Sequence, residues 1–134
     1  MTTLIDSNIL IDIFGDDSVW YDWSAARIKE AIERGPVYVN DVVYAESSIR
    51  YETIALFDDA LTQAGVSLVA IPREALFVAG KIFQQYRRAG GQRPGVLPDF
   101  LIGAHAAVAG LPLLTRDARR YRRYFPTLDL IAPP

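Results

Sequence analysis

The N-terminus carries the stretch Thr2-Thr3-Leu4-Ile5-Asp6-Ser7-Asn8-Ile9-Leu10-Ile11-Asp12, and the fold class can be worked out from it. A short apolar run ends at Asp6, Ser7 and Asn8, and a second apolar segment follows at once. In α/β folds the ligand crevice lies at the carboxyl ends of parallel strands, above all where the strand order reverses. Asp6 is therefore either a helix N-cap, which is a common role for Asp, or part of a functional site.

Short apolar strands and amphipathic helices alternate along the rest of the chain. After the strand at 4–5, we expect strands at 37–39, 66–71, 113–115 and 128–131. We expect helices at 8–14, 19–34, from 40 onward, 51–64, 73–89, 99–109 (opened by Pro98) and, rich in arginine, up to Tyr124. Such alternation predicts an α/β fold with a five-stranded parallel sheet and helices on both faces. Residues 1–134 are expected to form one domain.

The composition limits the class of protein. With 134 residues, 51% hydrophobic and 22% charged, the chain can bury a core. Cysteine is absent, which excludes disulfides and thiolate metal sites and fits a reducing compartment. No apolar run approaches the roughly 18 residues of a membrane span, and Asp6 and Asp12 interrupt any secretory signal. We therefore expect a cytoplasmic protein without a membrane partner.

Basic and acidic residues are unevenly distributed. Between Arg73 and Arg123 ten basic residues face three acids, whereas the rest of the chain has four basic residues and thirteen acids. The net charge of −2 hides this asymmetry. A basic half on an acidic protein indicates a phosphate-rich or acidic partner, unless it is only a solvated surface.

Four acids occupy similar positions relative to the predicted strands. Asp6 ends the first strand, Glu46 lies in the helix after the second, Asp99 opens a helix after Pro98, and Asp117 follows the fourth strand. Four carboxylates in one crevice would repel one another without a cation. Hard oxygen ligands of this kind suit Mg²⁺ or Mn²⁺, which can activate water and stabilise charge on a phosphoryl oxygen.

Other catalytic chemistries lack their residues. A thiol nucleophile is impossible without cysteine. The single histidine, His105, lies in an Ala-rich predicted helix, where a packed or surface role is more common than a catalytic one. No G-x-S-x-G motif is present.

Four motifs together resemble a known family. They are Leu4-Ile5-Asp6-Ser7-Asn8, Ala45-Glu46, Pro98-Asp99-Phe100-Leu101-Ile102-Gly103-Ala104-His105-Ala106 and Leu113-Leu114-Thr115-Arg116-Asp117. Their order and spacing resemble those of PIN-domain ribonucleases, and more narrowly the VapC-type toxins of bacterial toxin–antitoxin pairs. Each motif alone is weak evidence for this family, whereas the four in this order are specific to it.

The resemblance implies an activity and partners. It implies an acidic pocket that holds Mg²⁺ or Mn²⁺ and cleaves RNA, a cognate antitoxin, and a homodimer. Asp6 and Asp99 would bind the metal directly, and Glu46 and Asp117 directly or through water. Asn8 and Thr115 match polar positions that orient the ligands or the attacking water.

Four arginines are candidate contacts for RNA or for the antitoxin, and the sequence does not choose between the two. They are Arg87, Arg88, Arg93 and Arg116. Arg116, between Thr115 and Asp117, could pair with the acids or reach a substrate phosphate.

Two other functions stay open. A phosphatase of the haloacid-dehalogenase kind also places an Asp after its first strand. Members of that class have a second Asp at the position of Asn8 and a Lys near the end of the sequence, whereas the last Lys of this chain is Lys81. A non-catalytic PIN-like module that binds metal or RNA is the other alternative.

Overall fold

A five-stranded parallel sheet forms the centre of the computed structural model, which describes all 134 residues. Its strands are β1 (Thr3–Ile5), β2 (Val37–Val39), β3 (Val66–Leu68), β4 (Leu113–Leu114) and β5 (Leu130–Ile131). They are ordered β3-β2-β1-β4-β5, and every pair is parallel. The chain builds outward from β1 to β3 and then crosses back to β4, so the strand order reverses between β1 and β4. The predicted fold class is confirmed.

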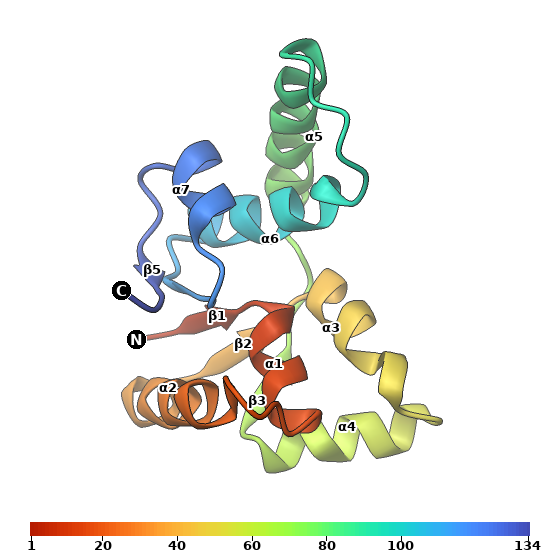
Figure 1. Cartoon of the computed structure of the whole chain (residues 1–134), viewed down its shortest axis with the longest axis vertical. Coiled ribbons are helices and arrows are strands. Elements are labelled where there is room, and N and C mark those ends of the chain that lie inside the picture. The colour runs from red at the N-terminus through yellow and green to blue at the C-terminus, as the bar shows by residue number, and fades with distance from the viewer.

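Helices cover both faces of this sheet. They are α1 (Ser7–Phe14), α2 (Tyr21–Arg34), α3 (Asp41–Ser47), α4 (Ile54–Gln63), α5 (Arg73–Arg88), α6 (Val96–Ala109) and α7 (Arg119–Tyr124), with a 3₁₀ turn η1 (Ser48–Arg50). Figure 1 shows α5, α6 and α7 on one side of the sheet and α1, α2 and α4 on the other. No helix is both long and apolar enough to cross a membrane.

Several predicted boundaries differ from the observed ones by one to three residues, and the three largest differences are these. The helix expected from residue 51 begins at Ile54, because the Thr53 side chain caps it by accepting a hydrogen bond from Leu56 N at 3.2 Å. The strand expected to reach residue 71 ends at Leu68, because β3 is an edge strand and Val69 makes the last ladder bond to Val39. Helix α6 begins at Val96, not at Pro98, and Pro98 falls in the first turn, where its missing N–H is not needed.

The core surrounds β1 and β4. The side chains of Leu4, Ile5, Leu113 and Leu114 are fully buried, as a strand covered on both faces requires. Helix α6 packs tightly against the end of α7: a Cβ at Gly103 would lie only 2.4 Å from the Phe125 ring. The strands on either side of the strand-order reversal are therefore in the interior of the protein.

Candidate active site

Asp6 lies at the C-terminal end of β1 with its carboxylate almost completely enclosed. It is 5% exposed. Its Oδ1 accepts a hydrogen bond from Ser7 N at 2.7 Å, and its Oδ2 accepts from Thr115 Oγ1 and from Tyr121 Oη, each at 2.9 Å. Asp6 is thus both the N-cap of α1 and a residue at the strand-order reversal, so the two roles considered for it are compatible.

Burial and hydrogen bonding act in opposite directions on Asp6. Burial raises the pKa of its carboxyl, while the hydrogen bonds from Thr115, Tyr121 and Ser7 lower it. The net direction is upward. Several donors aimed at one carboxylate are the arrangement expected for a group that works in its ionised form.

Glu46 reaches the same place from α3. Asn40 caps this helix, its Oδ1 accepting from the backbone N–H groups of Val42 and Val43 at 3.1 Å each. Glu46 Oε1 accepts a hydrogen bond from Ser7 Oγ at 3.0 Å. Burial raises the pKa of Glu46, and the charge of Asp6 raises it further.

Asp99, in the first turn of α6, is the third acid of this cluster. Burial first, and then the charges of Asp6 and Glu46, raise its pKa to about 6, although its ion pair with Arg120 acts against this. We call Asp6, Glu46 and Asp99 the acidic cluster. Its members repel one another across elements that lie 40 or more residues apart in the chain.

Asp117 is placed differently from the other three. Its side chain is exposed and lines a neighbouring cavity, while its backbone N–H donates to Thr115 Oγ1 at 3.1 Å. No three His, Cys, Asp or Glu side chains are arranged as a ready-made metal site. The structure places Asp6, Glu46 and Asp99 near enough for their charges to interact and leaves Asp117 apart from them, and a metal-binding role for each of the four stays a prediction.

Asn8 and Thr115 both contact Asp6. Asn8 Nδ2 lies 3.2 Å from Thr115 Oγ1 and 3.4 Å from Asp6 Oδ2. Asn8 Oδ1 also accepts a hydrogen bond from Arg116 N at 3.3 Å. These contacts tie the start of α1 to the end of β4 and hold the Asp6 carboxylate in one orientation.

Tyr121 is a site residue that the sequence interpretation missed. It is 2% exposed, and burial followed by the charges of Asp6 and Asp99 raises its pKa well above the ordinary value. One signal could have found it. Tyr121 and Tyr124 are spaced three residues apart among arginines, which marks the inward face of a short helix.

Arg116 pairs with an acid that the sequence interpretation left out of the site. Its Nε lies 2.9 Å from Asp12 Oδ2, and its guanidinium sits 5.5 Å from the centre of the Trp20 ring. Asp12 is 1% exposed and also accepts from Ser24 Oγ at 2.7 Å. This pair fastens the loop after β4 to α1 and α2.

The other three predicted arginines lie on or after the end of α5. Arg87 and Arg88 are exposed, and the Arg87 guanidinium lies 5.9 Å from the centre of the Phe83 ring. Arg93 lines a cavity that also contains arginines of α7. Arg93 is thus the one of the three that shares a cavity with residues next to the acidic cluster.

His105 has a packing role, as expected. It is 2% exposed, and its Nδ1 lies 3.2 Å from Asn40 Nδ2. Burial lowers its pKa. The neutral ring therefore accepts a hydrogen bond from Asn40, which also caps the helix that carries Glu46.

A family model for the PIN domain matches residues 3–126. The chain belongs to the PIN-domain family. This membership excludes the haloacid-dehalogenase alternative and confirms the family resemblance. Comparison with curated protein sequences finds no match.

Solved structures share the fold at low sequence identity. A chain of VapBC2 from Rickettsia felis, bound to a promoter DNA fragment, aligns with a TM-score of 0.73 and 15% identity over 100% of both chains. VapBC-1 from nontypeable Haemophilus influenzae gives 0.71 and 16% over 98% of both. DNA-bound VapBC from Salmonella typhimurium gives 0.69 and 16%, again over 98% of both. At these identities the likeness concerns the fold.

Proposed function

We propose that this PIN-domain protein is a Mg²⁺- or Mn²⁺-dependent endoribonuclease and that residues 1–134 form one nuclease domain. The observation that carries the proposal is the acidic cluster itself. Asp6, Glu46 and Asp99 are partly or fully buried. Burial raises the pKa of each, the charge of Asp6 also raises the pKa values of Glu46 and Asp99, and the charge of Glu46 raises that of Asp99. A protein gains nothing for its stability from such repulsion, whereas a bound divalent cation would relieve it.

The chemistry of the donor set suits such an ion, although no three of these side chains form a ready-made metal site. Asp6 and Asp99 would bind it, with Glu46 and Asp117 acting directly or through water, and carboxylate oxygens are the ligands that Mg²⁺ and Mn²⁺ prefer. The bound ion would lower the pKa of a coordinated water and stabilise the charge that develops on the scissile phosphate.

The protein's own residues position these groups. Thr115 and Tyr121 fix Asp6 by donating to Oδ2, and the Ser7 hydroxyl holds Glu46 beside it. Asn8 braces Thr115 at 3.2 Å. Catalysis by this site would rest on positioning and electrostatics, which is how phosphoryl transfer is generally accelerated.

The biological role we propose is that of the toxin in a type II toxin–antitoxin pair. The similar structures from Rickettsia felis, Haemophilus influenzae and Salmonella typhimurium are VapBC proteins, and another is a toxin–antitoxin complex from Klebsiella pneumoniae. By analogy this chain would act in the cytoplasm, form a homodimer and bind a cognate antitoxin. Arg87, Arg88, Arg93 and Arg116 are the residues proposed to contact RNA or the antitoxin.

Incubation with total RNA tests the proposal. We expect cleavage with Mg²⁺ or Mn²⁺ and none with excess EDTA. A non-catalytic module would bind RNA in both conditions without cutting it. Intact RNA in Mg²⁺ and in Mn²⁺ would reject the nuclease assignment.

A further inference from the structure

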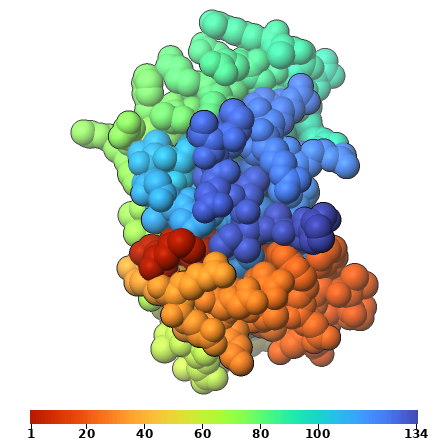
Figure 2. All heavy atoms as spheres, turned by 90° about the vertical axis from the view of Figure 1, so that its left-hand side faces the viewer, coloured from red at the N-terminus to blue at the C-terminus, as the bar shows by residue number.

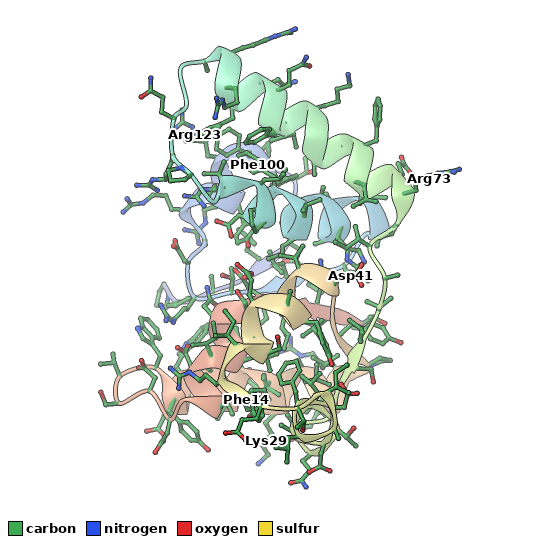
Figure 3. The ribbon with its side chains drawn as sticks, turned by 90° about the vertical axis from the view of Figure 1, so that its right-hand side faces the viewer. Phe14, Lys29, Asp41, Arg73, Phe100 and Arg123 are labelled. Atoms are coloured by element: carbon green, nitrogen blue, oxygen red, sulfur yellow. The ribbon has the colours of Figure 1, made fainter.

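A second site adjoins the acidic cluster. It is a cavity of about 580 Å³ lined chiefly by Arg93, Arg119, Arg120, Arg123, Tyr86 and Tyr124. We call it the arginine pocket. Arg93 comes from the segment between α5 and α6, and the other three arginines come from α7. In Figure 3, Arg123 extends beside the segment that joins α5 to α6, and Figure 2 shows the blue C-terminal region packed against it.

The pocket carries an excess of positive charge. One acid, Asp117, lines it alongside four arginines. Of these arginines only Arg120 forms an ion pair within the chain, so Arg93, Arg119 and Arg123 have no carboxylate partner. Arginines held together without counter-charges favour an anionic ligand, and the planar guanidinium fits phosphate in a bidentate manner.

Aromatic residues hold the walls of the pocket in place. Arg93 N donates a hydrogen bond to Tyr86 Oη at 2.9 Å. Gly91 packs so tightly on the Tyr86 ring that a Cβ there would lie 2.4 Å from it. Tyr86 in turn meets Phe100 and Tyr124 edge-on, at 5.7 and 6.1 Å between ring centres. These contacts hold the segment that carries Arg93 against α5 and close to α7.

Two residues connect the arginine pocket to the acidic cluster. Arg120 lines the pocket and also pairs with Asp99. Asp117 lines the pocket, and its backbone N–H donates to the same Thr115 hydroxyl that donates to Asp6. A chain of phosphates that reaches the acidic cluster from this side must pass the four arginines.

We infer that the arginine pocket binds the RNA nucleotide next to the scissile phosphate. The inference rests on the proposed nuclease function and assigns the substrate subsite beside it. Arg119, Arg123 and Arg93 hold the phosphate, and the rings of Tyr86 and Tyr124 give the base or ribose an apolar wall. The cavity volume falls within the range of about 300–1,000 Å³ that is usual for small-ligand sites.

RNA is favoured over an acidic peptide by the shared position of Arg120. A peptide carboxylate bound in the pocket would place no ligand group at the acidic cluster. A nucleic-acid backbone, in contrast, presents phosphates to the arginines and to the acidic cluster at the same time. Tyrosine rings beside arginines also match a ligand that combines flat bases with phosphates.

Binding of a fluorescein-labelled RNA hexamer in EDTA tests this inference without any cleavage. Arg119→Ala and Arg123→Ala should each weaken binding about tenfold, the loss of one charge-assisted phosphate contact. Each should also lower the slope of log K against log salt by close to one unit. Arg122→Ala is the matched control, since Arg122 is an exposed residue of the same helix that does not line the pocket, and it should change the affinity less than twofold.

Each possible outcome is decisive. Equal weakening by Arg122→Ala and Arg123→Ala would show a diffuse charge effect and overturn the subsite. Displacement of the RNA by a polyglutamate peptide, but not by adenosine 5′-monophosphate, would assign the pocket to an acidic protein and overturn it as well. Melting temperatures within about two degrees of wild type establish that the exposed-arginine variants are folded.

The experiment also separates this inference from the nuclease assignment. If wild type cuts RNA in Mg²⁺ while Arg119→Ala and Arg123→Ala bind the hexamer normally, the nuclease stands and the subsite falls. If both variants lose binding while wild type never cuts RNA, the pocket is an RNA site and the nuclease assignment falls.

Discussion

The hydroxyl of Tyr121 donates a hydrogen bond of 2.9 Å to Asp6 Oδ2, joining residues 115 positions apart. Tyr121 lies on α7 among four arginines, and Asp6 ends the central strand β1. The contact is buried on both sides, at 2% and 5% exposure. It makes the position of α7, and thus of the arginine pocket, depend on the same carboxylate that the proposed metal site uses.

Replacing Tyr121 by Phe removes this donor and keeps the ring. A hydrogen bond to a charged group contributes about 1.5–3 kcal/mol, so the free energy of unfolding at pH 7 should fall by an amount in that range. Because the Tyr121 hydrogen bond lowers the pKa of Asp6, RNA cleavage by the variant should also need a higher pH. Tyr124→Phe, which removes a hydroxyl without a hydrogen-bond partner, is the control. Equal urea midpoints and pH profiles for all three proteins would contradict the assigned role.

The raised pKa of Asp99 predicts that the stability of the metal-free protein depends on pH. Its folded pKa of about 6 lies above the ordinary 3.8, so the folded state binds more protons than the unfolded state between these values. The free energy of unfolding should therefore fall as pH rises from about 4 to 6, relative to that of Asp99→Asn. Urea denaturation in EDTA at several pH values measures this difference. If the free energy of unfolding depends on pH in the same way in wild type and in Asp99→Asn, the pKa of Asp99 is not raised in the folded protein.

We expect Asp12 to contribute to the stability of the fold although it lies outside the acidic cluster. It is fully enclosed, pairs with Arg116 and accepts from Ser24. Asp12→Asn leaves the Arg116 guanidinium without its counter-charge, which should cost about 2–3 kcal/mol, because Arg116 is itself partly solvated. Glu30→Gln breaks the exposed Arg27–Glu30 pair of α2 and should cost less than about 0.5 kcal/mol. Comparable losses in both variants would refute the special role of the buried pair.

Asn40 couples the cap of α3 to His105, and two variants separate its two contacts. Asn40→Ala removes both and should cost about 1–2 kcal/mol through the lost cap alone. Asn40→Asp keeps a capping oxygen but replaces the amide donor near His105 Nδ1 by a carboxylate. The pKa of His105, lowered by burial in wild type, should then rise, which an NMR titration of the single histidine measures. An unchanged titration in Asn40→Asp would show that the two side chains do not interact.

The sequence predicts the sheet because each strand is a short, mostly apolar run, and β1, β2 and β4 are each followed by a polar residue. Asp6 and Glu46 could be placed near one another because the carboxyl ends of parallel strands, and the elements that leave them, share one edge of the sheet. Helix α6, which carries Asp99, follows α5 and not a strand, so strand position alone does not place Asp99 there. The exact helix starts depend on the residue before the helix, a side-chain cap at Thr53 and a left-handed glycine at Gly95, which the hydrophobic pattern does not contain.

The contacts around the acidic cluster were less predictable. The partner of Arg116 is Asp12 because α1 runs past the end of β4, a consequence of strand order that spacing alone does not reveal. Tyr121 was missed because a tyrosine in an arginine-rich helix carries no chemical motif. Asp117 follows β4 as expected, but its side chain faces the arginine pocket, since its backbone and not its carboxylate bonds to Thr115.

The most direct test of the metal-dependent site is RNA cleavage by wild type and by Asp6→Asn and Asp99→Asn, each assayed in Mg²⁺ and in EDTA and each checked for folding by its melting curve. Wild type should cut only in Mg²⁺, and both folded variants should lose cleavage by a factor of at least about 100, the scale expected when a preorganised catalytic group is removed. Mg²⁺ should also raise the wild-type melting temperature, and that of Asp99→Asn much less, because a ligand at about 100 times its Kd contributes roughly 2.7 kcal/mol. Near wild-type cleavage by either variant, or cleavage by wild type in EDTA, would contradict the account.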